Sequence, residues 1–396
     1  MSGINLHIHP SDFRNETRIR KETKSLADGG ISDNIVIAAI WQDGLGLDEH
    51  QRLDDKRTVW RVRLKTRKWQ GNTFCKIIRH IEWAFKIFKR FRKSPVDFVN
   101  CHTLSSLPIG ILFRIFSKAK VVYDAHELET ERNGWSRPRK ALAKILERSL
   151  IHKTDMVIVV SDSIAQWYKD RYHLSNVHVI RNVPYRAKTV EERSDILKRK
   201  FGIGDDELLF IHQGLLGPAR GIELLLEVFS QVSRKKHIVF MGHGPLEQTI
   251  RDYESGFPNI HFQPAVKPQE ILKYTGSCDV GIHLPQNTCL SYYYSLPNKF
   301  FEYIVSGLPV IVSDFPEMAK IVDREICGWK VAPDKKAVME LIESISRENI
   351  EEIKINVLRN RDTYVWENKE KRLLGAYNDL FGNQKNYEKL DACEVM

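Results

Sequence analysis

The segment LLFIHQGLLGPARGIELLLEVF, residues 208–229, holds the pattern that decides the fold. An apolar run is followed by a loop that contains glycine and proline, and the loop is followed by residues with helical periodicity. This order predicts a buried strand, a tight turn and a helix, the repeating unit of a parallel sheet covered by helices.

The same order recurs on both sides of this segment. Other β-rich runs alternate with helical segments, and they occupy residues 4–9, 34–40, 96–102, 120–126, 155–161, 177–183, 237–244, 259–266, 279–284, 309–314 and 328–333. The alternation weakens over the charged residues 184–206, which we interpret as the approach to a second domain. The sequence therefore predicts an α/β protein with two doubly wound, Rossmann-like domains, residues 1–185 and 186–365, facing a ligand-binding cleft.

The composition is typical of a soluble globular protein. Of the 396 residues, 42% are hydrophobic and 28% are charged, which excludes disordered, collagen-like and coiled-coil chains. A net charge of +10 favours an anionic partner such as a phosphate or a membrane surface. The six cysteines form no C-x-x-C pair, and no signal-peptide pattern or long apolar run occurs. We therefore expect a cytoplasmic protein without a disulfide framework.

Two glycine-containing turns follow predicted strands. In the first turn, Gly214 ends the strand and Arg220 precedes the helix, so that a guanidinium and free backbone N–H groups would face a bound diphosphate. The alternative is an ordinary turn with a surface arginine. The second turn contains Gly242 and Gly244, and it is a weaker signal because most such turns only reverse the chain.

The segment YYYSLPNKFFEYIVSGLPVIVSD, residues 292–314, predicts a helix that begins near Pro297 and is followed by a buried strand. Asn298 and Lys299 lie at the start of this helix, and Glu302 lies one turn further on. A cation beside exposed N–H groups suits a phosphate, and the carboxylate suits ribose hydroxyls. The alternative is that Lys299 and Glu302 are solvated neighbours on a surface helix.

The segment KVVYDAHELETERNGW, residues 120–135, places Asp124, His126 and Glu127 at the carboxyl end of a strand. His102 ends the preceding strand, so it would lie beside them if the two strands are neighbours. Such a cluster of ionisable groups is typical of an active site, and the alternative is a structural cluster of caps and ion pairs. No spacing typical of metal ligands occurs, so we expect neither a metal nor a cofactor.

A basic amphipathic helix is predicted over residues 75–93. Ile77, Ile81, Phe85 and Phe91 fall on one face with other apolar residues, and most of the lysines and arginines fall on the opposite face. This helix could lie on an anionic membrane surface, or it could pack its apolar face on the sheet.

Together these segments resemble the GT-B fold glycosyltransferases, and most of all the family-4 retaining enzymes. The resemblance runs nearly from end to end, with VYDAHELE on the acceptor side and QGLLGPARGIELLLEVF, GHGPLE and LPNKFFEYIVSGLPVIVSD on the donor side. It implies an acceptor in the N-terminal domain, a nucleotide-sugar donor in the C-terminal domain, and a final helix within residues 366–396 that packs back on the first domain.

The resemblance also implies roles for single residues. Glu302 matches the second Glu of the E-x7-E motif, a ligand of the ribose hydroxyls, and Arg220 matches the basic residue that contacts the donor diphosphate. Gly214 matches the glycine of the first donor-domain turn, and His126 matches a histidine near the reaction centre.

Two positions depart from the family pattern. Tyr294 stands where the first Glu of the motif would fall, and Leu215 stands where an arginine usually follows the turn glycine. We hypothesise that Lys299 replaces the missing cation.

The sequence therefore predicts a retaining, hexosyltransferase-type enzyme of surface-polysaccharide synthesis. Its donor would be a nucleotide-diphosphate sugar, with UDP favoured, and its acceptor a saccharide or a lipid-linked saccharide. A sugar-nucleotide epimerase of the same fold and a non-catalytic scaffold that binds sugar nucleotides stay open as alternatives. No nucleic-acid-binding module is recognisable, so we expect no nucleic-acid partner.

Overall fold

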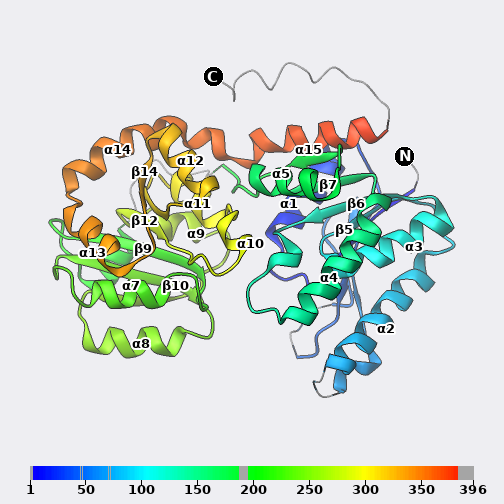
Figure 1. The fold of residues 1–396 in the computed structure, drawn as a ribbon, viewed down its shortest axis with the longest axis horizontal. Helices are drawn as coiled ribbons and strands as arrows, with labels where there is room; N and C mark the ends of the chain where they lie inside the picture. The colour runs from blue at the N-terminus through cyan, green and yellow to red at the C-terminus, as the bar shows by residue number, and fades with distance from the viewer. Residues whose placement is uncertain are drawn as a thin grey trace. The chain divides into compact units, whose positions relative to one another are not determined.

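The computed structural model describes residues 3–44, 46, 48–69, 71, 73–186 and 195–381, which form two α/β units (Figure 1). The first unit ends at Ile180 and resumes at Glu370, and the second spans Arg181–Lys369. The predicted boundaries, after residues 185 and 365, lie a few residues away from these. The predicted fold class, two Rossmann-like α/β domains, is confirmed.

The first unit contains an eight-stranded sheet in the order β3-β4-β2-β1-β5-β6-β7-β8. Its strands are β1 (Ile4–Ile8), β2 (Ile35–Ile40), β3 (His50–Arg52), β4 (Arg57–Val62), β5 (Val96–Cys101), β6 (Lys120–Ala125), β7 (Met156–Val159) and β8 (Val177–Val179). Among the described strand pairs of this sheet, β3–β4 alone is antiparallel. The helices of this unit are α1 (Thr17–Asp28), α2 (Thr73–Phe91), α3 (Leu107–Ser117), α4 (Arg137–Leu150) and α5 (Asp162–Tyr172).

Strands β3 and β4 were not predicted, because the charged arginines in them interrupt the run of apolar residues that is typical of a buried strand. Arg61 of β4 is nonetheless buried, and each of the three nitrogens of its guanidinium donates a hydrogen bond. Its Nε donates to the carbonyl of Asp12 (2.8 Å), Nη1 donates to the carbonyl of Asp48 (2.8 Å), and Nη2 donates to Gln51 Oε1 (2.7 Å). Burial of an arginine thus depends on partners that are remote in the sequence.

The second unit contains a six-stranded parallel sheet in the order β11-β10-β9-β12-β13-β14. Its strands are β9 (Leu208–Leu215), β10 (Lys236–His243), β11 (Ile260–Pro264), β12 (Val280–His283), β13 (Val310–Ser313) and β14 (Gly328–Val331). Its helices are α6 (Ile196–Phe201), α7 (Ile222–Phe229), α8 (Glu247–Gly256), α9 (Ile271–Thr275), α10 (Leu290–Tyr293), α11 (Asn298–Val305), α12 (Pro316–Glu325), α13 (Lys335–Ser344) and α14 (Arg347–Asn360). The predicted approach segment 184–206 contains α6, and its residues 187–194 lie outside the described residues.

Helix α2 has two apolar faces, so the prediction of a single one is wrong. Trp83, Ile87 and Phe91 are buried, and Trp83 Nε1 donates to the carbonyl of Ala39 in β2 (3.3 Å). A second set of apolar side chains on α2 is exposed and consists of Phe74, Ile77, Ile81 and Phe85. The predicted apolar face merged residues of both sets, because large side chains lie nearly all around this helix.

The last described helix, α15 (Trp366–Leu380), begins in the second unit and ends in the first. Within the first unit Leu374 packs so closely on Gly29 that a Cβ there would lie 2.5 Å from Leu374 Cδ2. The rings of Phe98 and Phe381 meet edge to face at 4.8 Å. Residues 382–396 of the predicted C-terminal segment lie outside the described residues. Across the described helices, we find none whose length and apolar character would allow it to span a bilayer.

Candidate active site

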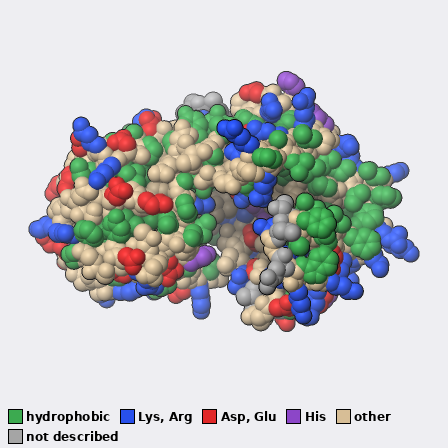
Figure 2. Space-filling view, turned by 60° about the horizontal axis from the view of Figure 1, so that its bottom comes forward, with side chains coloured by type: hydrophobic (Ala, Val, Ile, Leu, Met, Phe, Trp, Pro, Cys, Tyr) green, Lys and Arg blue, Asp and Glu red, His purple; other side chains and the backbone are tan. Residues whose placement is uncertain are grey.

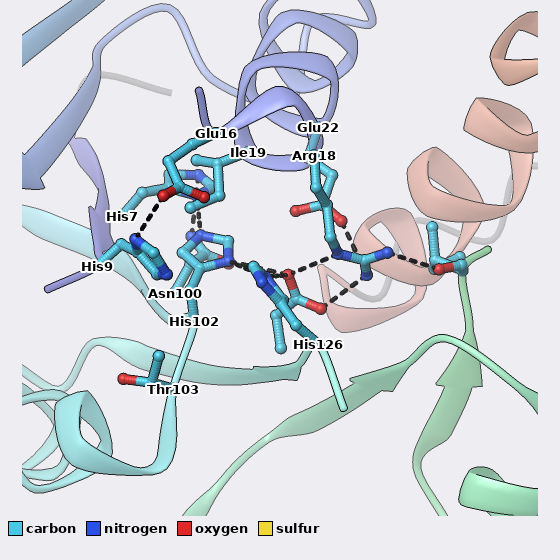
Figure 3. A network of polar contacts seen from close by, with 12 residues as sticks. His7, His9, Glu16, Arg18, Ile19, Glu22, Asn100, His102, Thr103 and His126 are labelled. Carbon is cyan, nitrogen blue, oxygen red and sulfur yellow. Dashed lines mark hydrogen bonds and ion pairs between the residues drawn. The ribbon is translucent and has the colours of Figure 1, made fainter. Parts of the chain in front are cut away.

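A cluster of histidines surrounds Asp124 at the carboxyl ends of three neighbouring strands of the first unit (Figure 3). His7 is in β1 and His9 follows it, His102 follows β5, and Asp124 and His126 lie at the end of β6. Because β1, β5 and β6 are adjacent and parallel, their carboxyl ends meet at one edge of the sheet. The structure thus brings His102 together with Asp124 and His126, which the sequence predicted on the condition that the two strands are neighbours.

Asp124 is the centre of this cluster. Arg18 of α1 donates from Nη2 to Oδ1 (2.7 Å) and from Nε to Oδ2 (3.2 Å). His102 Nδ1 and His126 Nε2 lie 2.8 Å and 2.9 Å from Oδ2. Burial opposes ionisation of this carboxyl, but Arg18 and His126 hold the pKa of Asp124 well below its usual range. The carboxylate therefore stays charged and serves as the common acceptor.

Burial favours the neutral form of three of these histidines, His7, His9 and His102, because it disfavours the imidazolium form. Burial lowers the pKa of His102 to about 4 despite the hydrogen bond to Asp124, and it lowers the pKa of His7 well below the usual range. Burial, together with the neighbouring His126, lowers the pKa of His9 to about 2. The ring of His9 stacks on that of His126 with 5.9 Å between centroids.

Glu127, the third predicted catalytic residue, forms an ion pair with Arg132 (2.8 Å). Its catalytic role stays a prediction. The neighbouring Glu129 is buried, and burial raises the pKa of its carboxyl to about 7.

Three side chains of the cluster could hold a metal ion. Among the residues that the structure describes, His102, Asp124 and His126 offer ligand atoms that all lie within 4.8 Å of one another. Linear spacing could not reveal this group, because two different strands supply it. The guanidinium of Arg18 already donates to both oxygens of Asp124, which disfavours a second cation there. The absence of a metal stays a prediction.

The turns of the second unit bring backbone segments into close contact. A Cβ on Gly242 would lie 1.9 Å from the carbonyl oxygen of Gly214, and one on Gly244 would lie 2.3 Å from that of Leu216. Gly221, with φ +84°, precedes α7, and a Cβ there would lie 2.2 Å from the carbonyl oxygen of Leu284. These three positions therefore require glycine.

Lys299 is a buried cation beside the first of these turns. It is the second residue of α11 and is only 8% exposed. A Cβ on Gly214 would lie 3.2 Å from Lys299 Nζ, and no described residue accepts a hydrogen bond from this Nζ. Burial and then the charge of Arg220 lower the pKa of Lys299 to about 7, and Glu302 partly opposes this effect. Burial of an ammonium without a hydrogen-bond partner is unfavourable, so a bound anion would be stabilised here.

Glu302 is held in place by the strand that precedes the turn. Gln213 Nε2 donates to Glu302 Oε2 (2.6 Å), and Thr275 Oγ1 donates to Gln213 Oε1 (2.7 Å). Glu302 and Lys299 belong to the same helix, so one element supplies both a cation and an oriented carboxylate.

The structure also describes the other predicted donor-side residues, Arg220 and Asn298. The guanidinium of Arg220 lies over the ring of Tyr292, 5.7 Å from its centroid. Asn298 is the first residue of α11 and is half-buried. At the two departures from the family pattern, Leu215 is exposed and Tyr294 ends the short helix α10.

Several site residues were not predicted. His7 and His9 alternate along a strand and therefore point to one face, so the run INLHIH contained a signal for them. Buried His212 and His283 lie close enough to Lys299 for its charge to lower the pKa of both imidazoles further, after burial. Arg18 carried no local signal, because its partner Asp124 is remote in the chain.

Two family models match the chain, one to each unit. Residues 37–183 match the model described as Glycosyltransferase Family 4, and residues 207–348 match the model described as Glycosyl transferases group 1. A chitobiosyldiphosphodolichol beta-mannosyltransferase of Kluyveromyces lactis is 24% identical over 334 residues, which are 74% of each chain.

Solved glycosyltransferase structures share the fold. The sucrose-phosphate synthase of Thermosynechococcus elongatus superposes with a TM-score of 0.76 at 16% identity, over 96% of this chain and 99% of that one. The Anabaena protein HepE, in complex with UDP and glucose, superposes with a TM-score of 0.71 at 14% identity, over 95% of this chain and 100% of that one. These matches favour a transferase over the epimerase and scaffold alternatives.

Proposed function

We propose, from the premise that this chain belongs to the GT-B glycosyltransferases of family-4 type, that it moves a hexosyl group from a UDP-sugar to a saccharide acceptor with retention. The observation that supports this most is the unpaired, buried ammonium of Lys299 beside Gly214, with the oriented carboxylate of Glu302 one turn away.

The donor-side chemistry follows from charge. The barrier to glycosyl transfer is the departure of a diphosphate from an oxocarbenium-like sugar. Lys299, Arg220 and the N-termini of α7 and α11 would stabilise the negative charge that develops on the diphosphate. Glu302 would accept hydrogen bonds from the ribose hydroxyls. In such a mechanism a phosphate oxygen of the leaving group takes the acceptor proton, so that no protein base is needed.

On the acceptor side, the Asp124 cluster would orient the reacting groups. His126 is the most exposed member of the pair that contacts Asp124 Oδ2, since its side chain is 23% exposed and that of His102 is 1% exposed. We therefore propose that His126 contacts the bound ligands. The buried residues His102 and Asp124 would hold the ring of His126 in place.

A nucleotide-binding panel tests the donor site. Calorimetry with UDP, GDP, dTDP, CDP and ADP is expected to show selective micromolar binding, which Glu302→Ala weakens because the ribose hydroxyls lose their acceptor. The control is Glu340→Ala, which removes an exposed carboxylate of α13. Equal affinities for all five nucleotides, or no effect of Glu302→Ala, would contradict the assignment. In a transfer assay, a product with the opposite anomeric configuration to the donor would contradict retention.

We also propose that the first unit binds the inner face of an anionic membrane, where a lipid-linked acceptor of surface-polysaccharide synthesis would be found. The exposed side chains Phe74, Ile77, Ile81 and Phe85 of α2 continue into Leu112, Ile115 and Phe116 of α3, and the rings of Phe88 and Phe116 join the two helices at 5.2 Å. We call these seven exposed residues the α2–α3 apolar face. Figure 2 shows hydrophobic side chains gathered on this part of the molecule, with Lys and Arg side chains beside them.

Charge favours a membrane rather than a protein as the occupant of this face. Lys76, Lys89 and Lys93 are exposed beside it. The only acid of α2, Glu82, is engaged with Lys86 (2.8 Å) and with the backbone N–H groups of Lys65 and Thr66. Apolar side chains rimmed by lysines suit the headgroup region of an anionic bilayer.

Ile81→Asp is expected to lower binding to phosphatidylglycerol-containing vesicles by about tenfold or more, because it removes apolar burial in the bilayer. Cosedimentation measures this binding. Ile355→Asp on α14 is the matched control, because both isoleucines are 61% exposed on helices. The membrane proposal fails if the two variants bind alike, or if neutral vesicles bind as well as anionic ones.

A further inference from the structure

Side chains from β1, β5, β6 and α15 form one continuous chain of hydrogen bonds that ends at His126. Figure 3 shows Asn100, His7, His102 and His126 of this chain. The hydroxyl of Tyr377 contacts Asn100 Oδ1, and Asn100 Nδ2 lies 3.2 Å from His7 Nε2. His7 Nδ1 lies 2.9 Å from His102 Nε2, and His102 Nδ1 lies 2.8 Å from Asp124 Oδ2. All of these residues belong to the first unit.

The direction of every hydrogen bond in this chain follows from Asp124. A carboxylate only accepts, so His102 Nδ1 must carry a proton. His102 is buried, and Arg18 already compensates the charge of Asp124, so His102 stays neutral and its Nε2 is a lone pair that accepts from His7 Nδ1. His7 is equally buried and makes its hydrogen bonds to His102 and Asn100 rather than to a carboxylate, so it is neutral too and its Nε2 is also a lone pair.

The lone pair on His7 Nε2 in turn decides how the amide of Asn100 is oriented. Only the NH2 group of Asn100 can donate to it, which turns Asn100 Oδ1 toward Tyr377. The second N–H of Asn100 donates to Asn5 Oδ1 (2.6 Å). The Tyr377 hydroxyl is then the terminal donor of the chain, and it holds the amide in this orientation.

The chain matters for His126 because His102 Nδ1 and His126 Nε2 lie only 3.2 Å apart. If His102 Nδ1 were a lone pair, it would compete with Asp124 for the N–H of His126. With a proton on His102 Nδ1, Asp124 Oδ2 (2.9 Å) is the one acceptor left for the N–H of His126 among the described residues.

We propose that Tyr377, Asn100 and His7 are positioning residues that keep His102 in its Nδ1–H tautomer and direct the Nε2–H of His126 to Asp124. His126 then presents Nδ1, rather than Nε2, to a bound ligand. Helix α15 thereby acts on the candidate catalytic histidine through side chains and without touching it. The role of His126 Nδ1 in glycosyl transfer rests on the proposed function. The assignment of the tautomers does not depend on that function.

Nuclear magnetic resonance tests the tautomers without any substrate. In the full chain labelled with 15N-histidine, long-range 1H–15N correlations distinguish protonated from unprotonated ring nitrogens. We expect His7 and His102 as neutral Nδ1–H forms and His126 protonated at Nε2, each assigned by its loss in a His→Gln variant. An unprotonated His102 Nδ1 in the wild-type protein, as a bound metal would cause, overturns the proposal.

Two variants test the positioning roles. Asn100→Asp replaces the donor to His7 Nε2 by an acceptor, and we expect this nitrogen to gain a proton that the wild type lacks. Tyr377→Phe frees the Asn100 amide, and we expect a second set of His7 signals. Tyr172→Phe, which removes another buried hydroxyl of the same unit, is the control and should leave His7 unchanged. Unchanged His7 signals in Asn100→Asp and Tyr377→Phe would overturn the proposal, and the wild-type spectrum decides the tautomers if a variant does not fold.

Discussion

Replacement of Lys299 by methionine is expected to weaken the binding of UDP by on the order of 10- to 100-fold, because a charge-assisted hydrogen bond to phosphate contributes about 1.5–3 kcal/mol. Methionine keeps most of the buried volume, so the loss reports the charge. The control is Lys336→Met, which removes an exposed lysine of α13. If calorimetry finds that Lys299→Met binds UDP with the wild-type affinity, the ammonium of Lys299 does not contact the donor.

The same lysine makes binding depend on pH. Its pKa is lowered to about 7 in the empty site, and a bound diphosphate would raise it, because an anion favours the ammonium. Above pH 7 the free protein must therefore take up a proton on binding, and affinity falls as pH rises, by at most about tenfold per pH unit. Below pH 7 the lysine is already charged, and this dependence disappears. Calorimetry in buffers of different ionisation enthalpy measures the proton uptake, which should be absent in Lys299→Met.

Asp124→Asn is expected to lower the free energy of unfolding by about 3 kcal/mol and to abolish most of the transfer activity. The substitution removes the charge that compensates buried Arg18, and it places an N–H2 group among donors that need an acceptor. The loss stays at the low end of the range for broken buried ion pairs, because Glu22 lies 2.9 Å from Arg18 and can take over as its partner. Urea unfolding measures the stability, and a product assay measures the activity.

Glu147→Gln is the matched control in the same unit. Glu147 is a buried carboxylate whose donors among the described residues are all uncharged hydroxyls, including those of Tyr168 and Tyr172 (both 2.8 Å). Hydroxyls can rotate to accept from an amide, and no buried cation is left behind, so we expect a loss of about 1 kcal/mol. If the two variants lose the same free energy of unfolding, the Arg18–Asp124 ion pair does not stabilise this unit more than the neutral hydrogen bonds of Glu147 do.

The sequence by itself determined the fold class of both units. Strand and helix periods are set by residues a few positions apart, so the alternation around residues 208–229 was sufficient to predict parallel sheets. It also placed His102 at the end of one strand and Asp124 and His126 at the end of the next, and parallel strands carry their carboxyl ends to one edge of the sheet. The turn glycines and the helix that begins at Asn298 were visible for the same local reason.

Only the tertiary structure decided which groups carry charge and which atoms they present. Arg18 pairs with Asp124 across 106 positions of the sequence, and Tyr377 reaches Asn100 across 277. Lys299 becomes an unpaired buried cation because strands and turns elsewhere in the second unit enclose it. The burial of a side chain and its hydrogen-bond partners depend on segments that are distant in the sequence. No local pattern could therefore reveal the neutral histidines, their tautomers or the second apolar face of α2.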